Sequence, residues 1–174
     1  MYKELCNSQS DINEHLPTLK YLAGQCTHVT EMGVRYIVST WAFLEGLEKG
    51  TLVSLDIKHP STYGGDITKV ESFAKEKGID FQFIEADSLK VNIDKTDLLF
   101  LDTDHTYLQV KGELERHAKR VRKFIVFHDT TSCEKEIMPA INEFLAENSK
   151  WKLLKRYENN NGLTVIENVG YSFL

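Results

Sequence analysis

The stretch DLLFLDTDHTY (97–107) places two aspartates and a histidine directly after a run of apolar residues. A second stretch, KFIVFHDT (123–130), repeats this arrangement with His128 and Asp129. Short continuous apolar runs that are rich in β-branched and aromatic residues are typical of strands covered on both faces of a sheet. The sequence therefore predicts two buried strands, over 97–102 and 123–129, that both end in ionisable side chains.

Around these stretches, the chain alternates between strand-like and helix-like segments. Three further apolar runs predict strands: THVTEMG (27–33), TLVSLDI (51–57) and DFQFIEAD (80–87). Helical spacing of apolar residues predicts helices over 39–50, 67–78, 106–121 and 133–147. We expect the first helix to end at Gly50, the third to bury Leu108, Val110, Leu114 and Ala118, and Pro139 to kink or delay the fourth. Such alternation indicates parallel strands joined by right-handed crossovers.

The two ends of the chain differ from this pattern. Residues 151–169 hold two strand-like runs separated by ENNNG (158–162), which favours a β-hairpin. Residues 8–24 are expected to form one helix, within an N-terminal helical segment (1–26) that packs on the core. The predicted fold is α/β, a doubly wound Rossmann-like sheet of seven strands, five parallel plus a C-terminal antiparallel hairpin. Helices cover both faces, in a single domain over 1–174.

Composition narrows the function classes. The 21 basic and 26 acidic residues give a net charge of -5, which argues against a nucleic-acid partner. No apolar run has transmembrane length, and the first residues do not resemble a signal peptide. The three cysteines are far apart with no C-x-x-C pair, so we expect reduced thiols and a cytoplasmic location. Assembly into a homo-oligomer is left open.

Polar and glycine residues stand at the end of every predicted parallel strand. In doubly wound sheets, ligands bind beyond the carboxyl ends of the strands, where the strand order reverses. Gly33, Asp56, Asp87, Asp102 and Asp129 all fall at such ends. The alternative is that these residues only begin loops, but five in the same position favour a binding site.

Four segments in order, EMGVRYIVST (31–40), LVSLD (52–56), EAD (85–87) and DLLFLDTDH (97–105), resemble class I S-adenosylmethionine-dependent methyltransferases. Within that class, the chain is most similar to small metal-dependent O-methyltransferases of the catechol, sugar and antibiotic-tailoring type. The resemblance implies an enzyme that transfers a methyl group from S-adenosylmethionine to a hydroxyl of a small acceptor, such as a sugar or a natural product. The alternative is a non-catalytic domain of this fold that binds a nucleoside-type ligand or a partner protein.

The resemblance also implies the cofactor-binding residues. Gly33 would let the backbone approach the methionine part, Ser39 would hold its carboxylate, Asp56 would bind the ribose, and Asp87 would lie with Ser88 at the adenine edge. The full implied set is Glu31, Gly33, Val34, Ser39, Asp56, Ile57, Asp87, Ser88 and Asp102. Ile37 departs from the family, because it occupies a usual glycine position. If that position demands positive φ, Ile37 is strained by about 1–3 kcal/mol.

In metal-using relatives, the ends of the fourth and fifth strands bind a divalent ion. Here these positions are Asp102, His128 and Asp129, and the implied ion is Mg or Mn. An imidazole ligand shifts the expected ion toward manganese, iron, cobalt or nickel, or leaves the site without one. Alternatively, Asp102 contacts only the cofactor and His128 caps a helix. His105 is implied as a catalytic base beside Asp102; it could instead orient a neighbour or pair with Asp104.

Overall fold

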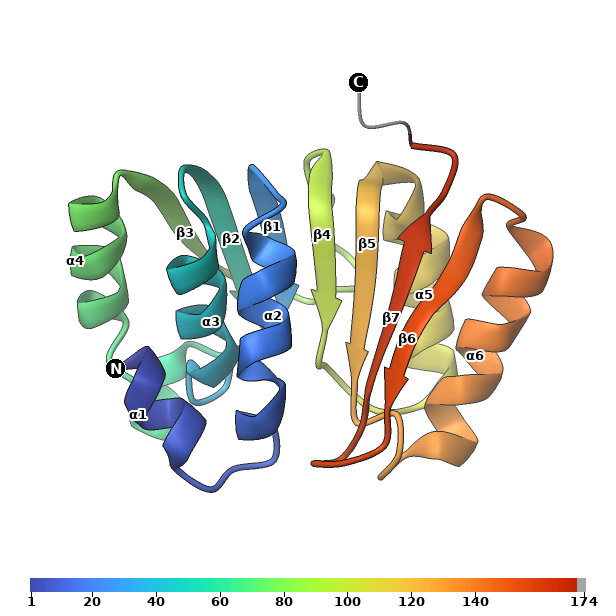
Figure 1. Ribbon diagram of the computed structural model, residues 1–174, viewed down its shortest axis with the longest axis horizontal. Coiled ribbons are helices and arrows are strands. Elements are labelled where there is room, and N and C mark those ends of the chain that lie inside the picture. The colour runs from blue at the N-terminus through green and yellow to red at the C-terminus, as the bar shows by residue number, and fades with distance from the viewer. Residues whose placement is uncertain (172–174) are drawn as a thin grey trace.

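The structure, a computed structural model, describes residues 1–171 and contains a single seven-stranded sheet within them (Figure 1). The strands are β1 (His28–Met32), β2 (Gly50–Asp56), β3 (Ile79–Glu85), β4 (Thr96–Leu101), β5 (Val121–His128), β6 (Trp151–Tyr157) and β7 (Leu163–Asn168). Their order in the sheet is β3-β2-β1-β4-β5-β7-β6, with β1 to β5 parallel and β6 and β7 antiparallel. The predicted fold class is confirmed.

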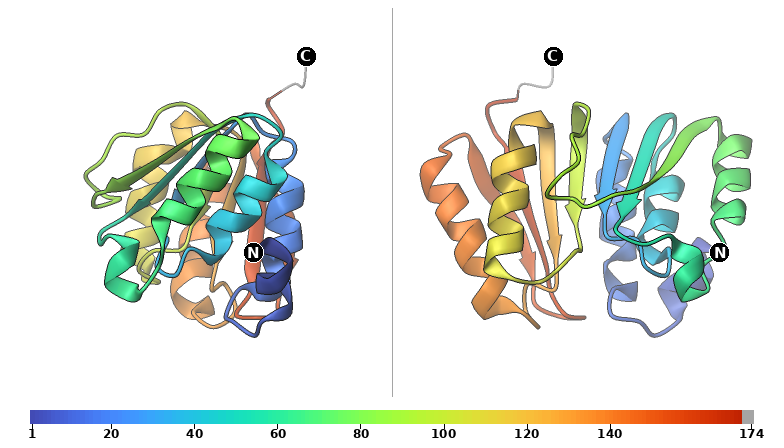
Figure 2. Two further views of the ribbon diagram at one scale, coloured as in Figure 1. Left: turned by 90° about the vertical axis from the view of Figure 1, so that its left-hand side faces the viewer. Right: turned by 180° about the vertical axis from the view of Figure 1, so that it is seen from behind.

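Helices cover both faces of this sheet. They are α1 (Tyr2–Asn7), α2 (Leu16–Ala23), α3 (Val38–Gly46), α4 (Ile67–Lys77), α5 (Tyr107–His117) and α6 (Glu134–Glu147). Figures 1 and 2 show α2, α3 and α4 on one face and α5 and α6 on the other. No helix within residues 1–171 is long and apolar enough to cross a membrane.

β4 shows why the core has two halves. All six of its residues are buried. Leu98 and Phe100 pack into the cluster beneath α2 and α3, whereas Leu99 and Leu101 pack beneath α5 and α6. Successive side chains of a strand point to opposite faces, so a continuous apolar run feeds both halves at once. Each fully buried side chain of this size contributes about 1.5–3 kcal/mol to folding.

The prediction of one N-terminal helix over residues 8–24 is wrong, because this segment contains a short 3-10 turn and only then a helix, α2. α1 ends when the side chains of Asn7 and Ser8 donate hydrogen bonds to the carbonyls of Lys3 and Glu4. A 3-10 turn at Asn13–His15 then leads into α2, whose first turn contains Pro17, the place where proline is best tolerated.

Two other helices differ from expectation. α3 ends at Gly46 rather than Gly50, which instead starts β2 with φ +118°. In α5, Leu108 is 77% exposed, and Glu113 is buried on the inner face with Val110 and Leu114. The buried residues of α5 recur at the spacing of about 3.6 residues that one helix face requires, and Leu108 does not fall on that face. α6 begins before Pro139 and continues through it, so the proline does not delay the helix.

Candidate functional site

The order of strands reverses between β1 and β4, and this switch point forms the candidate site. Gly33, directly after β1, has φ +89°. A Cβ on Gly33 would lie 1.9 Å from the carbonyl oxygen of Asp102, directly after β4. The close approach of two strand ends therefore requires glycine at position 33, whether or not a ligand is bound.

A cavity of about 450 Å³ opens beside these strand ends. It is lined by residues at or after the ends of β1, β2, β3 and β4 and by one residue of α5: Gly33, Arg35, Leu55, Asp56, Ile57, Tyr63, Ala86, Asp87, Ser88, Leu89, Asp102, Thr103, Asp104 and Gln109. Six of the nine expected cofactor-binding residues are among them. Glu31, Val34 and Ser39 are not.

Asp56 holds the loop that follows β1. Its Oδ2 accepts hydrogen bonds from the backbone N–H groups of Val34 at 2.8 Å and Arg35 at 3.0 Å, and its Oδ1 accepts one from Lys58 at 3.1 Å. Amide hydrogen bonds to a charged carboxylate are stronger than neutral ones. The residue expected to bind the ribose thus also fixes the backbone of the loop that follows β1.

Position 37 does demand a positive φ, the condition under which strain at Ile37 was expected. Ile37 has φ 65°, in the left-handed region, and precedes α3. Its side chain is buried and lies beside Gly65, where an added Cβ would be 2.8 Å from Ile37 Cδ1, and it is not among the residues that line the cavity. The strain is therefore offset by packing, and the side chain does not fill the cavity.

Glu31 and Ser39, which do not line the cavity, contact each other in the protein interior. The Glu31 carboxylate is fully buried and accepts hydrogen bonds from Ser39 Oγ (2.5 Å), Thr40 Oγ1 (2.8 Å) and Ser54 Oγ (2.5 Å). Burial raises the pKa of Glu31 to about 7. With its hydroxyl engaged, Ser39 offers no side-chain donor to a ligand in this arrangement; the cofactor role of either residue stays a prediction.

The loop after β3 is held by one face of α5. Ser88 Oγ, Thr103 Oγ1 and Gln109 Nε2 all donate to Glu113 Oε1, at 2.7, 2.7 and 2.9 Å. Asp87 forms an ion pair with Lys90 at 2.9 Å, and this contact lowers the pKa of the Asp87 carboxyl. The sequence reasoning missed Glu113, although a glutamate among apolar residues at helical spacing was a signal.

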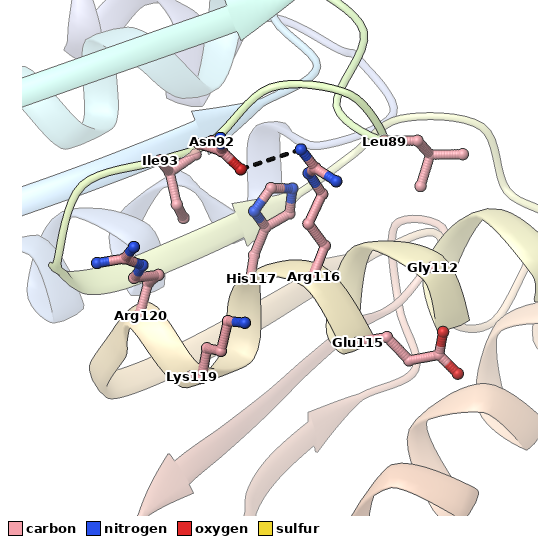
Figure 3. Close-up of a pocket in the computed structure, with 9 residues that line it drawn as sticks. All are labelled: Leu89, Asn92, Ile93, Gly112, Glu115, Arg116, His117, Lys119 and Arg120. Atoms are coloured by element: carbon pink, nitrogen blue, oxygen red, sulfur yellow. Dashed lines mark hydrogen bonds between the residues drawn. The ribbon is translucent and has the colours of Figure 1, made fainter.

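The other side of this loop borders a second cavity of about 440 Å³, shown in Figure 3. Arg116 reaches from α5 to the side chain of Asn92 at 3.0 Å and to the carbonyls of Lys90 and Val91 at 2.6 Å each. His117 Nε2 lies 2.7 Å from the Ser88 carbonyl. Arg116 and His117 thus hold the loop after β3 against α5.

Next to the first cavity, the ends of β4 and β5 converge as predicted. Leu101 is paired with Phe127, which makes Asp102 and His128 neighbours. Asp129 has φ 58°, and this turn places its carboxylate Oδ2 3.0 Å from His128 Nδ1. One ligand atom from each of Asp102, His128 and Asp129 lies within 4.8 Å of the others.

His105 contacts both aspartates of this cluster. Its Nε2 lies 3.3 Å from Asp102 Oδ1 and 3.1 Å from Asp129 Oδ2. Hydrogen bonding to Asp102 raises the pKa of His105. Burial opposes the charge on His128, but hydrogen bonds to both aspartates outweigh it and raise its pKa to about 10. Burial works likewise against ionised Asp102 and Asp129, yet the histidines lower both pKa values.

Segments distant in the sequence make hydrogen bonds to His128 and Asp129. His128 Nε2 lies 3.1 Å from the carbonyl oxygen of Asp11, in the N-terminal segment. Ser132 and Asn161 donate to Asp129 Oδ1, at 2.5 and 3.0 Å. Asn161 belongs to the turn of the C-terminal hairpin. No local feature of the sequence connects the N-terminal segment or this turn to Asp129.

Comparison with solved structures defines the fold. The O-methyltransferase from Bacillus cereus, solved with S-adenosylhomocysteine, is 16% identical, with a TM-score of 0.66 over 92% of this chain and 82% of that chain. The N-methyltransferase NodS from Bradyrhizobium japonicum WM9, also with this ligand, is 12% identical, with a TM-score of 0.67 over 96% of both chains. No protein-family model and no curated protein matches the sequence. The chain therefore has the class I methyltransferase fold.

Proposed function

We propose that the protein is an S-adenosylmethionine-dependent methyltransferase that acts on a hydroxyl group of a small acceptor. The observation that carries this proposal is the position of the cavity. It lies at the switch point of a methyltransferase fold, and it shares Asp102 with the adjoining cluster of His105, His128 and Asp129. A cofactor in the cavity would thus have a polar site for the acceptor beside it.

The charge of the cavity supports a cationic ligand. Asp56, Asp87, Asp102 and Asp104 line it, against one cationic side chain, Arg35. Carboxylates in a partly enclosed cavity create a negative potential that attracts a sulfonium. Transfer would break the S–CH₃ bond as an O–CH₃ bond forms, pass the proton of the acceptor hydroxyl to a base, the role expected of His105, and release S-adenosylhomocysteine. The sulfonium charge disappears along this path, and the protein chiefly aligns the two reactants.

The residues of the cluster fit a divalent metal ion. Asp102 Oδ1, Asp129 Oδ2 and His128 Nδ1 converge, while His128 Nε2 is directed at a backbone carbonyl, the outer contact typical of metal-binding histidines. A bound ion would polarise an acceptor hydroxyl and lower its pKa. The base role expected of His105 stays a prediction; its Nε2 lies 3.3 Å from Asp102 Oδ1 and 3.1 Å from Asp129 Oδ2.

The second candidate function is a non-catalytic domain that binds a nucleoside-type ligand or a partner protein. The left-handed Ile37 is the observation that favours it. Because Ile37 packs away from the cavity, it leaves room for a ligand, and we place the enzyme first. The small acceptor, the homo-oligomer and the cytoplasmic location stay predictions.

The test has two steps. Thermal unfolding is first measured with and without S-adenosylhomocysteine, which should raise the melting temperature; at 100 times Kd the stabilisation is about 2.7 kcal/mol. Methyl transfer from S-adenosylmethionine to a panel of catechols and sugars is then followed by mass spectrometry. Binding without transfer to any acceptor would favour the non-catalytic domain, and the absence of binding would refute a nucleoside site altogether.

A further inference from the structure

The second cavity, between α5 and the loop that follows β3, is lined by an excess of basic side chains (Figure 3). Arg116, Lys119 and Arg120 border it, against one acidic residue, Glu115. His117 also borders it, but burial lowers the pKa of its imidazole, so we count this side chain as neutral. Because the whole chain has a net charge of -5, the cavity is a local region of positive charge on an acidic protein.

The three cations have no acidic partner. Arg116 uses its Nε and Nη2 groups for uncharged acceptors, two carbonyl oxygens of the loop and the side-chain oxygen of Asn92, which leaves Nη1 for a ligand. Among the ion pairs within residues 1–171, none includes Arg116, Lys119 or Arg120. Figure 3 shows the Glu115 carboxylate turned away from both guanidinium groups. The cavity therefore presents positive charge that no carboxylate of this part of the chain neutralises.

Basic residues near the end of a helix also have an ordinary role, which is to offset the negative end of the helix dipole. Arg116 lies in the last turn of α5 and fits that role. Lys119 and Arg120 follow the last residue of α5, in a short 3-10 helix, and both are exposed. The dipole role predicts only a loss of stability when a cation is removed, whereas a binding site also predicts a loss of ligand affinity. The two roles can therefore be separated by experiment.

The chemistry and size of the cavity suit a phosphate ester. A guanidinium group presents paired N–H donors that match two phosphate oxygens, and a lysine ammonium binds phosphate as a point charge. The volume of about 440 Å³ lies in the range of small-molecule sites, about 300–1,000 Å³, and exceeds what one phosphate group requires. Leu89, Ile93 and Gly112 supply a wall without charge. The cavity thus has cations for the phosphate group and room for the organic part of the ester.

We propose that the second cavity binds a small phosphate ester, whose phosphate group contacts Lys119, Arg120 and the Nη1 group of Arg116. A small ester is favoured over a nucleic acid, because a nucleic-acid backbone needs an extended basic surface and this chain has a net charge of -5. The proposal does not rest on the methyltransferase function, since none of the three cations lines the first cavity. Leu89 borders both cavities, so the ester would touch the loop that forms one wall of the first.

The experiment titrates phenyl phosphate into chelator-treated protein and follows the backbone amide signals by NMR, which reports both the Kd and the place of binding. Lys119→Gln is compared with Lys95→Gln, because Lys95 is also exposed but does not line the cavity. We expect saturable shifts centred on Asn92 and Gly112 in wild type and in K95Q. K119Q and Arg120→Gln should each weaken binding by about 10-fold or more, the cost of one lost contact between charged groups.

Three results would overturn the proposal: no saturable shifts in wild type, equal weakening in K95Q and K119Q, or shifts centred on the residues of the first cavity. The second result would mean that phenyl phosphate senses only the net charge of the surface. Thermal unfolding of K119Q and R120Q checks that both fold, and lower stability with unchanged affinity would leave only the helix-dipole role. S-adenosylhomocysteine binding is measured in a separate titration, so its absence would count against the methyltransferase proposal and not against this site.

Discussion

At the scale of single residues, Gly33 and Ile37 adopt left-handed backbone for different reasons. Gly33 does so where the end of β1 touches the backbone of Asp102, and no side chain fits there. Ile37 does so at the start of α3, where its side chain gains a buried position. Steric exclusion requires glycine at position 33. Isoleucine is tolerated at position 37 because burial of its side chain outweighs the strain of its backbone.

Gly33→Ala should therefore be far more damaging than Gly64→Ala. Gly64 also has positive φ, +81°, but a Cβ there meets nothing within 4 Å. The change at Gly64 carries only the left-handed penalty of about 1–2 kcal/mol. At Gly33 the clash adds to that penalty, and we expect a loss of more than about 4 kcal/mol. Urea denaturation of both variants checks this; equal losses would refute the close approach.

Ile37→Gly should destabilise the protein although it relieves strain. Relief of the left-handed conformation gains about 1–2 kcal/mol, whereas loss of a buried isoleucine side chain costs about 2–5 kcal/mol. The expected net loss is about 1–3 kcal/mol, and the Kd for S-adenosylhomocysteine, measured by calorimetry, should not improve. Tighter binding in the variant would show that Ile37 obstructs the ligand.

At the scale of elements, buried carboxyls join strands to helices. Glu31 connects β1 to Ser39 and Thr40 of α3 and to Ser54 of β2. Glu113 connects α5 to the loop after β3. Glu31 thus holds α3 and β2 against β1, and Glu113 holds three residues that line the cavity, Ser88, Thr103 and Gln109.

The Glu31 carboxyl should make stability depend on pH. Burial raises its pKa from 4.5 to about 7, so the folded protein binds a proton that the unfolded chain releases between these values. The free energy of unfolding should therefore fall as pH rises across this window, by on the order of 2 kcal/mol. Glu31→Gln, which keeps the shape and cannot titrate, should flatten this slope in urea denaturation series from about pH 5 to pH 8. An identical slope in both proteins would contradict the assignment.

At the scale of the whole molecule, the site gathers segments that are far apart in the chain. The Asp11 carbonyl and Asn161 stand near opposite ends of the sequence, yet both contact the His128–Asp129 pair. The hairpin turn also binds the N-terminal segment, since Asn160 Oδ1 accepts from Glu14 N–H at 2.9 Å. The two ends of the chain thus act as one support for the cluster.

Asn161→Gly should weaken metal binding more than it weakens the fold. Asn161 has φ 66°, which glycine adopts freely, so the change removes chiefly the hydrogen bond to Asp129. Loss of such an outer partner lowers metal affinity by about 10- to 100-fold. Asn160→Gly is the matched control, because Asn160 contacts Glu14 and Ser10 but not Asp129. Dialysis against Co²⁺ should separate the two variants; equal affinities would argue against a supporting role.

Local sequence was sufficient for the sheet, because burial on both faces leaves continuous apolar runs and parallel strands deliver their carboxyl ends to one edge. It was sufficient, for the same reason, to bring Asp102, His128 and Asp129 together. Tertiary structure alone decided three features of the site. They are the hydrogen bond of the Ser39 hydroxyl to Glu31, the contacts of His105 with Asp102 and Asp129, and the contacts of Asn161 and Asp11 with the His128–Asp129 pair. Those features depend on side-chain directions and on contacts between residues distant in the chain, and no local pattern encodes either.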